Sequence, residues 1–172
     1  MTAPLIPELP GFDDPVAVLR ACHERMLDHC DLLERLVAHV ADKGPDMEAS
    51  SAAAKVYRYF TTAARHHHQD EEQDLFPLLA RQSMKIADLA FALRKDHERL
   101  ETLWDELAPA LRRVQDIEGN ADFAARAAEF CQLTRAHVEK ENREFLPQVQ
   151  HSLNSRQLQE IGRAMEKRRR DG

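Results

Sequence analysis

The sequence predicts an all-α protein folded as an up-down antiparallel four-helix bundle, with an N-terminal arm and a short C-terminal helix. Two observations lead to this fold class. Glycine is rare, with 5 in 172 residues, and aromatic residues make up only 6%, as in helical proteins rich in Ala, Leu, Glu and Arg. Apolar residues also recur at steps of three and four along four long segments. Helices of about 25 to 30 residues would each be about 40 Å long, and short connections make them antiparallel neighbours.

Charge and composition exclude several classes of protein. The net charge of −6 argues against a general nucleic-acid or anionic-membrane binder. No stretch approaches the roughly 18 apolar residues of a membrane span, and the first residues lack the basic and apolar regions of a signal peptide. Three unclustered cysteines do not make a disulfide framework. We therefore expect one cytoplasmic domain without a nucleic-acid or membrane partner, and the oligomeric state is left open.

The first helix has a clear start. Residues 1–13 are expected to form an extended arm, because prolines recur there without a helical periodicity. Asp14 followed by Pro15 then favours a helix start, since Asp caps the free amides and Pro lacks only a hydrogen that would be unpaired there. The apolar stripe runs to Val40, and a Gly-Pro pair at 44–45 ends the helix.

The second and third helices are marked by their ends. The second begins near Asp46, and Pro77 is expected to kink or end it. The third starts after Ser83, bends at Pro109 and ends at the Gly-Asn turn at 119–120.

The fourth helix runs from about Phe123 to Pro147. A shorter segment follows, roughly Asn154 to Arg170, and ends in four basic residues, which suit a helix C-terminus. The expected division of the chain is an arm at 1–13, the bundle at 14–150 and a C-terminal helix with a basic tail at 151–172.

The two halves of the chain share an internal repeat. Residues 23–25 read His-Glu-Arg and recur at 97–99, while the pattern His-x3-Glu-x5-Pro occurs at 67–77 and again at 137–147. The spacing inside the second pattern is identical in both copies. Two helix pairs related by a pseudo-two-fold axis would bring all four histidines near one level.

These repeated polar residues predict a metal site. A His and a Glu four residues apart lie on one helical face, and here that face is the apolar stripe. Burying unpaired carboxylates is expensive, so two inward glutamates beside four histidines call for a compensating positive charge. This donor set suits iron, with zinc or manganese as alternatives, and each glutamate can bridge two ions. The predicted ligands are His23, His67, Glu71, His97, His137 and Glu141.

This series on four successive helices resembles the hemerythrin-like HHE cation-binding domain family. The Leu-Phe-Pro at 75–77 and the Phe-Leu-Pro at 145–147 also look like that family's pattern, and the resemblance covers roughly residues 14–150. It implies two non-haem iron ions with an oxo or hydroxo bridge. It further implies one iron on His97 and His137, the other on His23 and His67, and bridging by Glu71 and Glu141. Family members bind oxygen, sense oxygen or iron, handle nitric oxide, or repair iron-sulfur centres.

The third helix departs from the oxygen-carrying hemerythrins, which have a His-x3-His pair there. The partner of His97 is Glu101 in this chain. Either Glu101 coordinates as an anionic replacement, or it points elsewhere and leaves an additional open position on one iron. Both alternatives argue against simple reversible oxygen carriage, because ligand type and vacancy tune a metal.

Three adjacent histidines compete for one ligand position. Neighbours on a helix differ by about 100°, so they cannot all face one way. His67 is preferred because its spacing matches the second copy, and His68 is the competitor, three residues before Glu71. His66 is expected at the surface.

The remaining residues near the ligands receive structural interpretations. Asp70 and Glu72 are expected to be solvated neighbours, and Phe60 and Trp104 to be core residues. Cys30 is expected to be a small buried core residue, although it could line a pocket. Cys22 and Cys131 receive no role.

Three functions fit the sequence. The first is a di-iron protein that binds oxygen or a related diatomic ligand for storage, delivery, scavenging or sensing, where sensing would require a separate protein partner. The second is an iron-donating or nitric-oxide-handling protein of the iron-sulfur repair type. The third is a weak di-iron oxidase or peroxidase, disfavoured because the Glu-x-x-His pairs of ferritin-like sites are missing. No phosphate loop, HExxH or CxxC motif is present, so no enzymatic activity is assigned.

Overall fold

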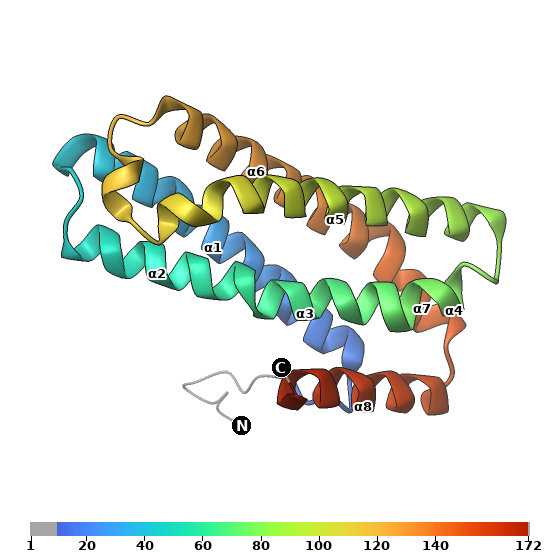
Figure 1. Ribbon diagram of the computed structural model, residues 1–172. Coiled ribbons are helices and arrows are strands. Elements are labelled where there is room, and N and C mark those ends of the chain that lie inside the picture. The colour runs from blue at the N-terminus through green and yellow to red at the C-terminus, as the bar shows by residue number, and fades with distance from the viewer. Residues whose placement is uncertain (1–9, 172) are drawn as a thin grey trace, which may run out of the picture.

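The computed structural model describes residues 10–171 and confirms the all-α bundle (Figure 1). The long helices are α1 (Pro15–Lys43), α2 (Met47–Thr61), α5 (Met84–Leu111) and α6 (Ala121–Lys140). The shorter elements are α3 (Ala63–Gln69), α4 (Phe76–Leu79), α7 (Leu146–Ser152) and α8 (Ser155–Asp171), the π-helical turns η1 (Asp70–Leu75) and η3 (Glu141–Phe145), and the 3-10 turn η2 (Val114–Ile117). Within the described range there is no strand. The expected arm falls mostly on residues 1–9, which lie outside that range.

Each long helix begins with a side-chain cap. Asp14 accepts a hydrogen bond from the amide of Ala17 at 3.0 Å, and Asp46 accepts one from Ala49 at 2.8 Å. Ser83 and Asn120 cap α5 and α6 in the same way. Side-chain oxygens at these positions satisfy amides that have no partner within the helix. The predicted starts of the long helices agree with these caps, whereas the predicted end of the third helix at the turn at 119–120 is wrong: α5 ends at Leu111, and the separate turn η2 precedes the Gly-Asn pair.

One alternative of the prediction, that Pro77 ends the second helix, is wrong. The chain continues through α3, η1 and α4 to Leu79 as one rod, and η3 and α7 repeat this arrangement around Pro147. Proline lacks an amide hydrogen, and its ring clashes with the carbonyl four residues earlier in a regular α-helix. The wide π-helical turn before each proline accommodates both defects. The rod has one interruption that the sequence did not signal, at Thr62 between α2 and α3.

The apolar core is divided in two by a layer of buried polar side chains. One cluster surrounds Met26, Phe60 and Trp104, and the other surrounds Leu19 and Phe145. On α1 and α5 the buried histidine falls between residues of the two clusters, and the rods that carry His67 and His137 pass from the first cluster to the second just beyond these histidines, at Leu75 and Phe145. The polar layer therefore crosses the bundle at one level, as the internal repeat predicts.

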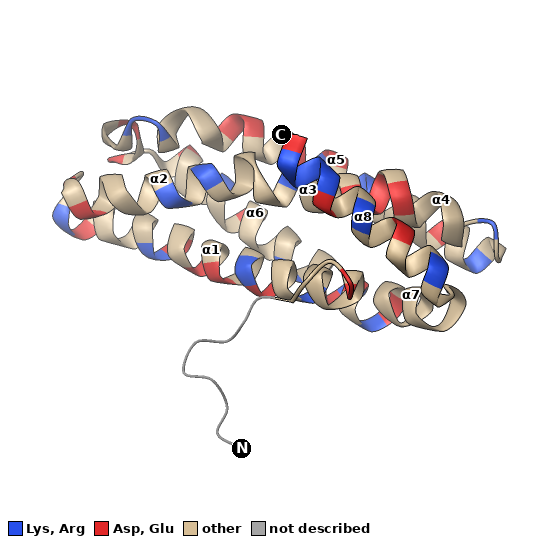
Figure 2. Cartoon of the chain, turned by 90° about the horizontal axis from the view of Figure 1, so that it is seen from below, with Lys and Arg blue, Asp and Glu red and all other residues tan. Residues whose placement is uncertain are grey.

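The C-terminal helix lies along the bundle. Figure 1 shows α8 beside α1, and the view from below in Figure 2 places it over α3 and α4, with basic residues near its end. It contacts α1, α3 and η1 and buries Ile161 and Met165 in the second apolar cluster. Gly162 lies so close to Phe12 that a Cβ would be 1.9 Å from the Phe12 carbonyl oxygen, so only glycine fits there.

None of the helices in residues 10–171 has the length and apolar character needed to cross a membrane.

Candidate metal centre

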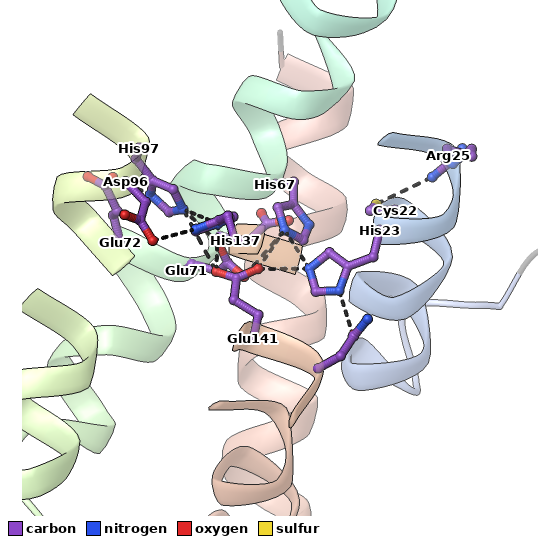
Figure 3. A network of polar contacts seen from close by, with 12 residues as sticks. Cys22, His23, Arg25, His67, Glu71, Glu72, Asp96, His97, His137 and Glu141 are labelled. Carbon is purple, nitrogen blue, oxygen red and sulfur yellow. Dashed lines mark hydrogen bonds and ion pairs between the residues drawn. The ribbon is translucent and has the colours of Figure 1, made fainter. Parts of the chain in front are cut away.

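Four histidines from four helices meet in the polar layer. His23 comes from α1, His67 from α3, His97 from α5 and His137 from α6, and each is at most 4% exposed. They form two pairs: the Nε2 atoms of His23 and His67 lie 3.1 Å apart, and so do those of His97 and His137 (Figure 3). The histidines of α1 and α3 thus form one pair, and the histidines of α5 and α6 form the other.

Two glutamates link these pairs. Glu141 places Oε2 2.9 Å from His23 Nε2 and Oε1 3.0 Å from His137 Nε2. Glu71 places Oε1 3.3 Å from His67 Nε2 and Oε2 3.3 Å from His97 Nε2. Each carboxylate therefore presents one oxygen to each histidine pair. Both glutamates are fully buried and stand at or near the start of a π-helical turn, a feature often found at functional sites.

The donor atoms have the spacing of metal ligands. Atoms bound at about 2.1 Å to one ion and about 90° apart lie about 3 Å from one another. The nitrogen and oxygen atoms fall into two groups that share both carboxylates: His23, His67, Glu71 and Glu141 in one, and His97, His137, Glu71 and Glu141 in the other. All four carboxylate oxygens are buried without a hydrogen-bond partner. Because such oxygens are costly to bury, the residues fit two cations.

Without a bound cation, protons on the histidines compensate the negative charge of the buried carboxylates. Burial lowers the pKa of His97, but the Glu141, Glu71 and Glu72 carboxylates outweigh burial and raise it to about 11. The pKa of His137 is also raised, because Glu141 and Asp96 outweigh its burial. In Glu141, burial raises the pKa and the surrounding imidazoles outweigh it, so the carboxylate stays ionised. The layer is thus built to hold positive charge between its carboxylates.

The outer nitrogens of three rings have fixed partners. His23 Nδ1 donates to Asn142 Oδ1 at 2.7 Å, and His97 Nδ1 donates to Glu72 Oε1 at 2.7 Å. His137 Nδ1 lies 3.4 Å from Asp96, which also accepts from Lys140. Such contacts fix the orientation of the imidazole and keep its Nε2 directed at a metal.

His67 faces a thiol on its outer side instead. The Cys22 side chain lies beside it, and Arg25 Nη2 donates to Cys22 Sγ at 3.4 Å (Figure 3). Burial raises the pKa of this thiol, but His67 and Arg25 outweigh burial and lower it to about 7. Cys22 receives no role from the sequence, because no spacing connects it to a residue on another helix. Cys30 is fully buried in the first apolar cluster, as expected.

The expectation that Asp70 and Glu72 are solvated neighbours is wrong. Asp70 is fully buried and accepts hydrogen bonds from Arg168 and Arg169 of α8. Glu72 is half-buried against His97. The helical phase correctly excludes both from the layer itself, but it carries no information about α8 or α5, which cover the other faces of this rod.

The adjacent histidines are also resolved. His67 is the ring that faces Glu71, whereas His66 is half-buried on another face. His68 stacks on His97 with ring centroids 3.9 Å apart and planes 17° apart. Glu101 points away from the layer: its side chain is 66% exposed and lies 3.9 Å from Arg65. Glu101 therefore lies at the surface beside Arg65 and not in the layer, and whether it coordinates stays a prediction.

A cavity of about 280 Å³ lies on the His97 side of the layer. It reaches His97 and His137, but neither His23 nor His67 is among its lining residues. Phe60 and Trp104, which the sequence places in the core, also form part of its wall. The lining residues are Met26, Phe60, Ala64, Arg65, His68, Gln69, Glu72, Gln73, His97, Leu100, Glu101, Trp104, Phe130, Thr134 and His137.

Comparison with known proteins agrees with this architecture. The model of the family described as hemerythrin HHE cation binding domain matches residues 14–149. An uncharacterized protein of Haemophilus influenzae is 28% identical over 112 residues, which cover 62% of this chain and 65% of the relative. The matched part thus spans just under two thirds of the relative's length.

Proposed function

Because the chain belongs to the hemerythrin HHE cation-binding domain family, we propose that it holds two non-haem iron ions and binds oxygen or a related diatomic molecule at them. One ion would lie between His97 and His137 and the other between His23 and His67. Glu71 and Glu141 would bridge them, together with an oxo or hydroxo group. The observation that carries this proposal is that each buried carboxylate presents one unpartnered oxygen to each histidine pair.

The residues of the chain support this function in distinct ways. The bound iron pair would supply a change of redox state and an open position for a small ligand. Glu72 and Asp96 hold the rings of His97 and His137 in place. Burial of the two carboxylates keeps bulk water from competing for the ions. The cavity beside His97 provides access for a diatomic molecule on that side of the pair.

A second candidate function is iron donation or nitric-oxide handling of the iron-sulfur repair type. The exposed position of Glu101 favours it, because the His97 side then has one protein donor fewer than in the oxygen-carrying hemerythrins. Fewer donors make an ion easier to release and leave more room for other ligands. Weak oxidase or peroxidase activity is a third prediction, and the same experiment detects it.

The test is the iron content per chain together with the optical spectrum of the reduced protein before and after oxygen is admitted. Two irons per chain and a charge-transfer band that disappears on oxygen removal would support oxygen binding. Irreversible oxidation or iron release would favour the second candidate, and consumption of added peroxide the third. Fewer than one metal per chain would contradict the di-iron proposal. His137→Ala should lose the band, and His151→Ala, at an exposed position, is its matched control.

A further inference from the structure

The cavity beside His97 is larger than a diatomic ligand requires. A water molecule occupies about 30 Å³ of the liquid, and a cavity that holds one can be smaller still. The volume of about 280 Å³ is several times that value. It approaches the lower end of the range for sites that take organic molecules, roughly 300 Å³.

One wall of the cavity is aromatic. The ring of Phe60 lies 5.2 Å from that of Trp104 and 4.9 Å from that of Phe130, and Trp104 lies 5.7 Å from Phe130. These three rings come from α2, α5 and α6 and support one another in the first apolar cluster. Aromatic surfaces of this kind favour a flat apolar partner that stacks or meets them edge to face.

The inner end of the cavity is polar, and its carboxylate, Glu72, is already engaged by His97 Nδ1 at 2.7 Å. His68 lines it together with His97 and His137, and one nitrogen of each of the three rings lies within 4.8 Å of the others. His68 and His97 stack almost in parallel, so their nitrogens do not converge on one point as two ligands of one ion would. The His68 ring therefore faces the cavity as a hydrogen-bonding group beside the open metal position.

Apart from Glu72, which pairs with His97, the charged side chains of the lining stand at the mouth of the cavity. Arg65 and Glu101 lie 3.9 Å apart there, with side chains 49% and 66% exposed. A ligand whose buried end carries a charge would lose its hydration inside the cavity without gaining a buried counter-charge from Arg65 or Glu101. The lining therefore favours a molecule whose buried part is neutral.

We propose that this cavity binds a small organic molecule with a flat apolar body and one neutral oxygen donor, a hydroxyl or hydroperoxyl group. The body lies against Phe60, Trp104 and Phe130, and the oxygen meets His68 beside the metal position. The placement of the oxygen rests on the proposed metal centre, whereas the binding of the body does not. This site adds a ligand class beyond the diatomic molecules of the proposed function.

Phenol is the simplest probe of this class, and Trp104 reports its binding. Trp104 is the single tryptophan of the chain and lines the cavity, so tryptophan fluorescence reports on this wall of the cavity. We expect phenol to change this fluorescence saturably, with a Kd on the order of 1 mM for so small a ligand. A change that stays linear with phenol concentration would overturn the proposal.

Cavity-filling variants test the location. Ala64→Leu and Leu100→Phe enlarge side chains that line the cavity from α3 and α5, and either should abolish saturable binding. Ala128→Leu, at an exposed position of α6, is the matched control and should bind like the wild type. Unchanged phenol affinity in both filling variants, with helical content preserved, would overturn the assignment to this cavity.

His68→Ala tests the polar end. Loss of one hydrogen bond should weaken phenol about 2- to 10-fold and leave toluene, which lacks the oxygen, unaffected. Equal effects on phenol and toluene would overturn the role of His68. Metal content is measured on the same samples, with and without chelator. Saturable phenol binding by a sample that was never treated with chelator and holds fewer than one metal per chain would therefore contradict the di-iron proposal while supporting the cavity site.

Discussion

Arg169 donates two hydrogen bonds to Asp70, from Nη2 to Oδ2 at 2.7 Å and from Nη1 to Oδ1 at 3.1 Å. These two residues are 99 positions apart in the chain. Asp70 directly precedes Glu71 and is the first residue of the π-helical turn η1. The last turns of α8 are therefore tied to the backbone that positions one of the two central carboxylates.

Removing this tie should destabilise the protein. Arg169→Met keeps an apolar stem of similar length but leaves buried Asp70 with fewer donors. We expect a loss of about 1–3 kcal/mol in the free energy of unfolding, which corresponds to about 2–4 °C in Tm for each kcal/mol. Thermal unfolding followed by circular dichroism measures it. Arg170→Met, at an exposed neighbouring position, is the control, and equal Tm values for the two variants would contradict the role of the Asp70 contact.

Glu141→Ala should remove most of the bound metal. The variant would leave four imidazoles with a single buried carboxylate, so the charge of two cations would be poorly compensated. Metal per chain, measured by elemental analysis after purification, should fall from two to one or fewer. Glu139→Ala removes an exposed carboxylate from the same helix and should keep the wild-type content. Equal metal contents in the two variants would rule out bridging by Glu141.

Glu101→Ala should leave the metal centre unchanged. Its carboxylate lies at the surface beside Arg65, so the variant loses only an exposed ion pair, which contributes little to stability. Iron content and the optical spectrum should match those of the wild type, whereas His97→Ala should alter both. A shifted spectrum in Glu101→Ala would instead show that this side chain reaches the metal.

The metal-free protein should lose stability at alkaline pH. The pKa of His97 is raised from 6.5 to about 11 in the folded state, so protonation of this ring favours folding. This stabilisation is complete below pH 6.5 and is lost as the pH rises toward about 11. Urea unfolding at several pH values in this range measures the decline. In the metal-loaded protein the ions replace the protons, so the decline should be smaller.

Metal uptake should release protons, because the histidines that are protonated in the metal-free protein must lose their protons to bind a cation. Titration calorimetry in buffers of different ionisation enthalpy counts them, and uptake without proton release would contradict protonated histidines in the metal-free layer.

Helical phase alone accounts for what the sequence predicts best. His23, His67, His97 and His137 each fall on the apolar stripe of a predicted helix, so their orientation toward the core follows from local periodicity. The caps at Asp14 and Asp46 are equally local, because each side chain bonds an amide three residues later. These features need no knowledge of the rest of the chain.

Contacts between distant segments account for what the sequence does not predict. Asp70 is buried by arginines 98 and 99 residues away, and no local pattern announces that α8 returns to this face. The π-helical turn before Pro77 is hidden for another reason, because the sequence signal of a proline is the same whether the helix ends or widens. The sequence predicts Phe60 and Trp104 as core residues. Because the wall of the cavity is as apolar as the core, the sequence does not distinguish the two.

The division of the core by the polar layer has a consequence for how the bundle unfolds. Two apolar clusters of moderate size stabilise the two ends of the molecule, and the layer between them contributes few apolar contacts. In the metal-free protein each end can therefore open with its own free energy, as a separate cooperative unit. Ions bound to ligands from four helices would couple the two ends, so that the bundle melts in a single transition.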